Sequence, residues 1–263
     1  MPTRFGVVVT ARADSGMLPV YSALNAALEE AVPSAGILDS WCWPKDLDVG
    51  EDGIPIYDVT PQSNLVALKD FIDDYCHGRE GPFEVTLLGR CAGAQTALRY
   101  CRWDHRVTRV VAIEPTTWYH FASPYDYDAA LKRINKARPY SPLITRQLPT
   151  DQAQSVEFRL APKLYSVDEQ HLSFLLDPPE SWFFVPLNWP EMYFIAGGHD
   201  SVTPPDSVRR LYEQARVPDG AGKGYIEVGK ANHDFGDNAE DLANVLRAVR
   251  RCLIGGGNFD ERW

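Results

Sequence analysis

Residues 87–95 read Leu87-Leu88-Gly89-Arg90-Cys91-Ala92-Gly93-Ala94-Gln95, and this stretch decides how the rest of the sequence is interpreted. It places a Gly-x-Cys-x-Gly pentapeptide directly after an apolar run and directly before a segment with helical spacing. A strand that turns at once into a helix presents the central residue at the tip of a sharp turn. Both glycines would make room for that turn, because a Cβ at either position would meet neighbouring backbone. At a helix N-terminus Cys91 would favour the thiolate, although a buried cysteine in an ordinary strand–turn–helix would read the same.

The segments on either side alternate between strand and helix patterns, which is typical of a parallel sheet wrapped by helices. About six strands are predicted from their short apolar runs, at residues 4–10, 35–41, 83–88, 107–113, 192–196 and 225–228. Helical spacing predicts helices at residues 19–31, 64–76, 93–101, 207–215 and 239–252. The glycine-rich tail from Gly255 onward is expected to be flexible.

Residues 116–190 break this alternation. They are rich in proline and aromatic residues, and no strand is predicted there. A connection of this length inside an α/β domain usually has a function. The sequence therefore predicts a core formed by residues 1–115 and 191–263, with a mostly helical cap inserted at 116–190; a separate small domain is the alternative.

Two later segments supply the partners that a catalytic cysteine needs. Asp200 follows the predicted strand at 192–196, and His233 follows the predicted strand at 225–228. Parallel strands end at the same edge of a sheet, so these side chains are expected near Cys91. Taken singly, Asp200 would serve equally well as a turn cap and His233 as a surface histidine. Their order along the chain and their placement after strands favour a catalytic triad.

With these residues the sequence resembles the α/β-hydrolase superfamily, in which nucleophile, acid and histidine follow one another in this order. The resemblance implies an α/β-hydrolase fold with Cys91 as nucleophile, His233 as general base and Asp200 as the acid that orients the imidazole. It also implies an oxyanion hole built from the N–H of Ala92 and a second N–H from the loop after the first strand. Arg12 is the first choice for that second donor, and Ala11 is the next.

Other residues near these motifs have alternative roles. Glu114 follows the strand at 107–113, where some members of the superfamily carry the triad acid, so it competes with Asp200 for that role. Asp234 is expected to cap the last helix. Arg90 points off the turn and could meet an acidic substrate, but a surface salt bridge is the expectation.

A cysteine in the nucleophile position narrows the function. Dienelactone hydrolases and aminoacyl-shuttle enzymes of nonribosomal peptide pathways resemble this sequence in using one. A thiolate attacks near neutral pH more readily than a hydroxyl, and its acyl product is a thioester. The leading interpretation is therefore a cysteine-dependent hydrolase, thioesterase or acyltransferase. The alternatives are a non-catalytic small-ligand binding protein of the same fold, and a serine enzyme whose nucleophile has been replaced by Cys91.

The expected substrate is a small acyl compound, presented on a carrier protein or on coenzyme A. The aromatic side chains of residues 116–190 are expected to form the core of the cap, and a few of them to line an acyl pocket. The residues chosen for substrate binding are Trp118, Tyr119 and Trp182. No histidine pair has metal-ligand spacing and no nucleotide-binding loop occurs, so neither a metal nor a cofactor is expected.

Composition sets the remaining limits. Of 263 residues 44% are hydrophobic and 24% are charged, as in an ordinary globular protein. The net charge of −10 argues against a nucleic-acid partner, which would need a basic surface. Apolar runs are too short to span a membrane. Five cysteines without a Cys-x-x-Cys pair and the lack of an apolar leader predict a cytoplasmic location.

Overall fold

The computed structural model describes residues 2–10, 19–38, 61–115, 155–160, 163–168, 190–233, 235 and 238–263. Its centre is a seven-stranded sheet with the order β2-β1-β3-β4-β7-β8-β9. All neighbouring strands are parallel. The strands are β1 (Thr3–Val9), β2 (Ala35–Leu38), β3 (Phe83–Arg90), β4 (Val107–Ile113), β7 (Glu191–Gly197), β8 (Lys223–Val228) and β9 (Phe259–Arg262).

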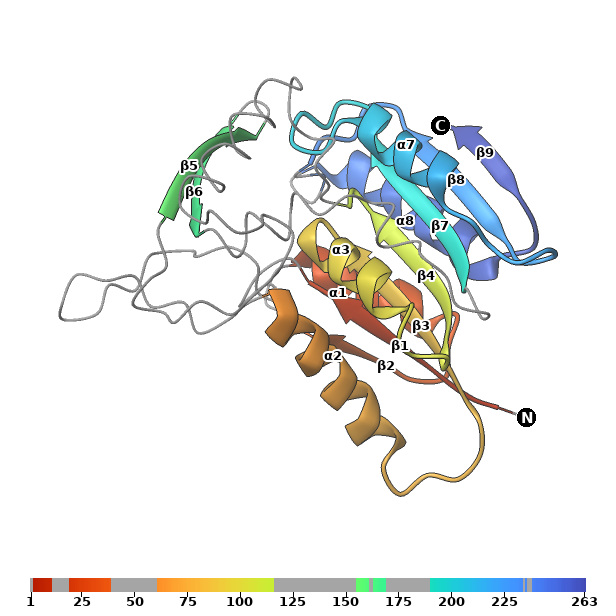
Figure 1. The fold of residues 1–263 in the computed structure, drawn as a ribbon. Coiled ribbons are helices and arrows are strands. Elements are labelled where there is room, and N and C mark those ends of the chain that lie inside the picture. Colours follow the sequence, from red (N-terminus) through yellow and green to blue (C-terminus); the bar gives the residue numbers. More distant parts are fainter. Residues whose placement is uncertain are drawn as a thin grey trace.

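Helices cover both faces of this sheet (Figure 1). On one face lie α2 (Pro61–Cys76), α3 (Ala92–Tyr100) and α7 (Pro205–Gln214), and on the other lie α1 (Pro19–Glu29) and α8 (Ala239–Ile254). Successive residues of a strand therefore enter different cores: Val7 and Val9 pack with the first group, and Val8 with the second. Burial on both faces explains why these strands read as continuous apolar runs.

Local sequence sets the helix ends. Pro19, Pro61 and Pro205 each begin a helix, where their missing N–H removes no helical hydrogen bond. The Asn238 side chain caps α8 by accepting from the N–H groups of Glu240 and Asp241. A parallel sheet flanked by helices is what the sequence predicts, and that prediction is confirmed.

The expected flexibility of the tail after Gly255 is wrong. Its last residues form β9, which pairs with β8 from Gly224 opposite Phe259 onward. The Phe259 ring stacks on Tyr193 at 5.4 Å between ring centroids, and a Cβ on Gly224 would lie only 2.3 Å from that ring. Glycine at 224 thus makes room for the aromatic anchor of a seventh strand, one more than expected.

Residues 116–190 also contain strands. A hairpin is formed by β5 (Ser155–Leu160) and β6 (Lys163–Asp168), which pair antiparallel. Val156, Phe158 and Leu160 alternate with polar residues, the period of a strand. The expectation of no strand in this segment is therefore wrong here. Most of the segment lies outside the described residues, so its helical cap character and the domain division remain predictions.

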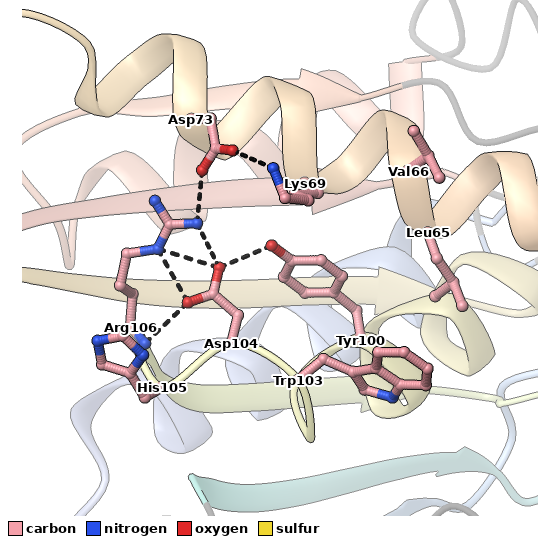
Figure 2. A pocket seen from close by; sticks show the side chains of 9 residues that line it. All are labelled: Leu65, Val66, Lys69, Asp73, Tyr100, Trp103, Asp104, His105 and Arg106. Atoms are coloured by element: carbon pink, nitrogen blue, oxygen red, sulfur yellow. Dashed lines mark hydrogen bonds and ion pairs between the residues drawn. The ribbon is translucent and has the colours of Figure 1, made fainter.

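A hollow of about 560 Å³ lies between α2 and the turn from α3 to β4 (Figure 2). Leu65, Val66 and Trp103, which is 71% exposed, form its apolar wall. This turn leads into the amino end of β4, whereas Cys91 follows the carboxyl end of β3, so the hollow is not part of the site described below. Within the described part of the chain, no helix is long and apolar enough to cross a membrane.

Candidate active site

Cys91 lies in the turn between β3 and α3 with φ 52° and ψ −121°. A left-handed φ is rare for a residue with a side chain and persists where the surroundings fix it. Here the Cys91 N–H donates to the Ile113 carbonyl at 2.9 Å, and the Cys91 carbonyl accepts from the Gln95 N–H at 3.2 Å. The residue is 8% exposed. Ala92, the next residue, begins α3, so its N–H has no partner from a preceding helical turn.

Both glycines of the pentapeptide are required by space. A Cβ on Gly93 would lie 2.1 Å from the Val9 carbonyl oxygen, and a Cβ on Gly89 would lie 2.5 Å from the Cα of Ala94. The steric role predicted for these glycines is confirmed. They let α3 approach β1 and β3 closely enough to hold Cys91 at the carboxyl edge of the sheet.

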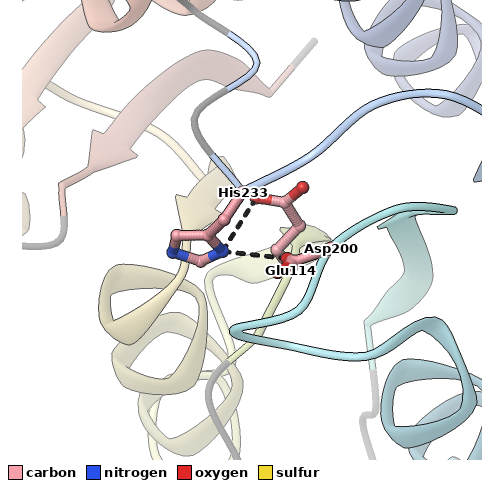
Figure 3. A group of neighbouring side chains, drawn as sticks. All are labelled: Glu114, Asp200 and His233. Atoms are coloured by element: carbon pink, nitrogen blue, oxygen red, sulfur yellow. Dashed lines mark hydrogen bonds and ion pairs between the residues drawn. The ribbon is translucent and has the colours of Figure 1, made fainter. Parts of the chain in front are cut away.

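Asp200 and His233 come together from the loops after β7 and β8. Two glycines allow these loops to touch: a Cβ on Gly197 would lie 2.6 Å from the Ala231 carbonyl oxygen, and one on Gly198 would lie 2.6 Å from that of Gly229. The His233 Nδ1 is consequently 2.9 Å from Asp200 Oδ2 (Figure 3). The structure thus joins these two predicted residues directly.

Four donors surround the Asp200 carboxylate. Oδ1 accepts from the N–H groups of Val202 at 2.7 Å and Thr203 at 2.8 Å. Oδ2 accepts from the Thr203 hydroxyl and faces His233 Nδ1. Burial opposes charge on Asp200, but the hydrogen bonds from His233 and Thr203 outweigh it and hold the pKa of this carboxyl below its usual range. Asp200 is therefore ionised at neutral pH.

His233 connects Asp200 to Cys91. Burial of the imidazole disfavours its charged form, but the interaction with Cys91 and the hydrogen bonds to Asp200 and Cys91 raise the pKa of His233 well above its ordinary value. Because Nδ1 faces Asp200, Nδ1 carries the proton of that bond. The opposite nitrogen, Nε2, points away from both acids in Figure 3. An imidazole held in this way can accept a proton from a thiol and return it to a leaving group.

Glu114 is a second acid at the same imidazole. Its Oε2 lies 3.4 Å from His233 Nδ1, against 2.9 Å for Asp200. The side chain is 1% exposed, and neither carboxyl oxygen makes a hydrogen bond within the described residues. Burial, together with the charge of Asp200, raises the pKa of Glu114 well above its usual range. Asp200 is thus the hydrogen-bonded acid of the pair with a lowered pKa, and Glu114 is the acid with a raised pKa.

Glu114, Asp200 and His233 are also the one group of potential metal ligands in the part of the chain that the structure describes, with ligand atoms within 4.8 Å of one another. A metal would need lone pairs of Asp200 and of His233 Nδ1. Protein donors already occupy both Asp200 oxygens, and Nδ1 carries a proton. The donor set therefore fits a hydrogen-bonded acid–histidine pair better than a metal site.

Arg90 departs from the expected surface salt bridge. Its side chain is mostly buried, and its Nη2 donates to the backbone carbonyl of His233. The guanidinium also lies over the Phe235 ring at 4.9 Å, and Nε is 3.8 Å from Glu114 Oε2. Arg90 therefore connects the turn at Cys91 to the histidine loop. The only indication of this contact in the sequence is that Arg90 directly precedes Cys91.

Solved structures resemble this fold at low sequence identity. Est1E from Butyrivibrio proteoclasticus has a TM-score of 0.60 at 10% identity, over 96% of this chain and 88% of its own. A monoacylglycerol lipase from Paleococcus ferrophilus has a TM-score of 0.59 at 19% identity, over 95% and 93%. The esterase domain of a Rhodothermus marinus protein gives 0.57 at 15% identity, over 96% and 89%. The chain has the α/β-hydrolase fold. No protein-family model and no curated protein sequence matches it.

In an α/β-hydrolase fold the nucleophile turn, the acid loop and the histidine loop meet at the carboxyl ends of the strands, as Cys91, Asp200 and His233 do here. Other predicted site residues lie outside the described residues: Arg12 and Ala11 of the proposed oxyanion hole, Asp234, and the proposed substrate contacts Trp118, Tyr119 and Trp182. Thr203 was not predicted to hold Asp200, although its position three residues later is typical of a hydroxyl that closes a turn.

Proposed function

We propose that this protein is a cysteine-dependent acyl-transfer enzyme that acts on thioesters or activated esters through Cys91, His233 and Asp200. The observation that carries the proposal is the placement of His233, whose Nδ1 lies 2.9 Å from Asp200 Oδ2 and whose pKa is raised by the interaction with Cys91. The esterases and the lipase that share the fold support acyl chemistry in general.

The proposed reaction begins at the Cys91 sulfur. His233 takes the thiol proton, and the thiolate adds to the carbonyl carbon of the substrate, whose oxygen becomes an oxyanion. The tetrahedral species collapses by breaking the bond to the leaving thiol or alcohol, which receives the proton from His233. The acyl group then remains on Cys91 as a thioester. Attack by water or by an acceptor thiol, with His233 again moving the proton, releases the product.

The oxyanion would be held by N–H groups at the start of α3. The Ala92 N–H is the first donor proposed, since it directly follows the nucleophile and has no partner from a preceding helical turn. Arg12 remains the proposal for the second donor. Asp200 keeps the proton on His233 Nδ1, so that Nε2 is the nitrogen that exchanges protons with sulfur and leaving group.

Substrate choice is proposed to depend on residues 116–190. Trp118, Tyr119 and Trp182 would contact the acyl group, while a carrier protein or coenzyme A would present it as a thioester. Exchange between two thioesters is nearly isoenergetic, so a cysteine enzyme suits transfer between thiols as well as hydrolysis. We also propose that the protein acts in the cytoplasm.

The test is intact mass spectrometry after incubation with a panel of acyl-thioesters, with and without an acceptor thiol. An acyl adduct that maps to Cys91, disappears in Cys91→Ala and is discharged by the acceptor thiol is expected. Free acid without acceptor would assign a hydrolase, and an acylated acceptor would assign a transferase. If no substrate leaves an adduct or a product, the protein is the non-catalytic ligand binder that the sequence also allows.

A further inference from the structure

Glu114 is a buried carboxyl that the proposed mechanism does not use. It follows β4 directly and has φ 48°, so it joins Cys91 as a residue with a side chain in the left-handed region. Its N–H donates to the Ile195 carbonyl at 2.8 Å, which fixes its backbone between β4 and β7. Such strain persists only where the surroundings hold it, and it concentrates at functional sites.

The space around this carboxyl is made by glycine. A Cβ on Gly197 would lie 2.8 Å from Glu114 Oε1. The carboxyl makes no hydrogen bond among the described residues, and its two ionic neighbours are His233 Nδ1 at 3.4 Å and Arg90 Nε at 3.8 Å. A purely structural residue at this position would be more stable as an apolar side chain, because a buried polar group without a hydrogen bond is costly. A glutamate here therefore calls for a role at the imidazole.

The charges around Glu114 come from every loop that meets at the site. Arg90 at the end of β3 contributes a positive charge, Asp200 after β7 a negative one, and Cys91 with His233 form a balanced pair when the proton has moved. Glu114 completes a neutral cluster only if it keeps its own proton. Two carboxyls at one imidazole do not ionise together, since each charge disfavours the other.

We propose that Glu114 is a reserve acid of the triad, a positioning residue that stays protonated beside His233 while Asp200 is charged and ionises to take over Nδ1 when Asp200 loses its charge. The inference rests on the proposed role of His233 as the base. It follows from one juxtaposition: two carboxyls from different loops, both fully buried, face the same imidazole nitrogen.

The test is a double-mutant cycle of Asp200→Asn, Glu114→Gln and the double variant, with Glu227→Gln on β8 as a control at another buried glutamate. Glu114→Gln should slow kcat/KM far less than Asp200→Asn does, because Asp200 still holds His233 Nδ1 when Glu114 is replaced. Asp200→Asn should lose on the order of 10²-fold, and the double variant about 10⁴-fold, the loss seen when a triad has no working acid. Glu227→Gln should match the unmodified protein.

The pH profile separates a reserve acid from a structural residue. In Asp200→Asn the remaining activity should increase more steeply as pH rises and Glu114 ionises than in the double variant, in which only the thiol and the imidazole titrate. A double variant no slower than Asp200→Asn, or a flat profile in Asp200→Asn, would overturn the proposal.

Titration of the His233 side chain by NMR in the same four proteins gives a readout that needs no turnover. The pKa of His233 should fall far more in the double variant than in either single variant. If no substrate is turned over, the function proposed above fails, while this titration still decides whether Glu114 acts on His233. Equal titration in Asp200→Asn and the double variant would exclude that action.

Discussion

Two residues of the candidate site, from different loops, carry backbone strain. Cys91 after β3 and Glu114 after β4 have φ of 52° and 48°, and among the described residues only glycines share that region. Each residue held in such a sparsely populated backbone conformation costs about 1–3 kcal/mol. The Cys91 N–H bonds to the residue just before Glu114, so one hydrogen bond links the two strained positions. The strain is thus concentrated where Cys91 and the two acids meet the sheet.

The Cys91–His233 pair predicts a characteristic pH dependence of alkylation. Because the pKa of His233 is raised, its imidazolium persists as pH rises through neutrality and would stabilise a thiolate at Cys91. Iodoacetamide should therefore label Cys91 at a nearly constant rate from about pH 6 to 8, whereas His233→Ala should label faster with rising pH, like a free thiol with a pKa near 8.5. Peptide mapping of the labelled protein measures both.

Cys76 serves as the internal control for this experiment, since burial raises the pKa of its thiol. It should label slowly in both proteins. Identical pH profiles of Cys91 labelling in the unmodified protein and in His233→Ala would show that Cys91 and His233 do not form an ion pair. A Cys91→Ser variant that turns over faster would show that the site is built for serine.

Arg90 gives a prediction about loop position. Arg90→Met removes the donor to the His233 carbonyl and the contact with the Phe235 ring. A hydrogen bond from a charged donor is worth about 1.5–3 kcal/mol, so kcat/KM should fall about 10- to 100-fold. Arg90→Lys should recover part of this loss. Hydrogen exchange of the histidine loop should increase in Arg90→Met; unchanged exchange together with unchanged kinetics would contradict the assignment.

At the scale of elements, the approach of α3 to β1 depends on Gly93. Gly93→Ala would place a methyl group 2.1 Å from the Val9 carbonyl oxygen and 2.4 Å from that of Thr10. Neither backbone atom can move without displacing β1, so thermal unfolding should show a loss of more than about 3 kcal/mol. Gly220→Ala is the matched control: it has φ 86° and nothing within 4 Å of its Cβ. It should cost only about 1–2 kcal/mol.

The hollow in Figure 2 holds a polar network that ties α2 to the turn before β4. Arg106 donates to Asp104 through Nε at 2.9 Å and Nη2 at 2.6 Å, and to Asp73 at 2.7 Å. The Tyr100 hydroxyl donates to Asp104 at 2.6 Å. Burial opposes charge on Asp104, but these donors hold its pKa below the usual range.

This network predicts a pH-dependent share of the stability. Asp104→Asn should lower the free energy of unfolding by about 2–3 kcal/mol at neutral pH. Since the folded pKa of Asp104 is lowered, its contribution is present above the unfolded pKa of about 3.9 and is lost as pH falls through the folded value. Chemical denaturation should show the two proteins converging below about pH 4. Lys69→Met, which breaks an exposed ion pair with Asp73, should cost less than about 1 kcal/mol.

Most of the strands that the sequence predicted are buried on both faces of the sheet. Continuous apolar runs such as Val7-Val8-Val9 reveal a central parallel strand without further information. The edge strand β9, Phe-Asp-Glu-Arg, carries no such run, and it forms because β8 offers a free edge and Gly224 a space for Phe259. Its existence depends on a partner that is 35 residues away in sequence, so local pattern could not predict it.

The candidate site likewise contains residues that the sequence predicts and residues that it does not. The glycine spacing around Cys91 and the strands before Asp200 and His233 place those three residues from sequence alone. Arg90 and Glu114 act through tertiary contacts; Arg90 meets the His233 carbonyl across 143 residues. Their burial, and with it the raised pKa of Glu114, follows from the assembled loops. Residue type and local spacing therefore do not predict the burial of Arg90 and Glu114.

On the scale of the whole molecule, every neighbouring pair in the seven-stranded sheet is parallel, so no pair forms from a local hairpin. The largest separation is between β4 and β7, where Arg109 lies beside Glu191, 82 residues later. At a synthesis rate of roughly 5–20 residues per second, β4 leaves the ribosome about 4–16 seconds before the strand that covers it. During that time β4, which later lies at the centre of the sheet, is an apolar edge strand. Photo-crosslinking of nascent chains halted before residue 191 should therefore capture chaperones at β4, and chains halted after β7 has emerged should not.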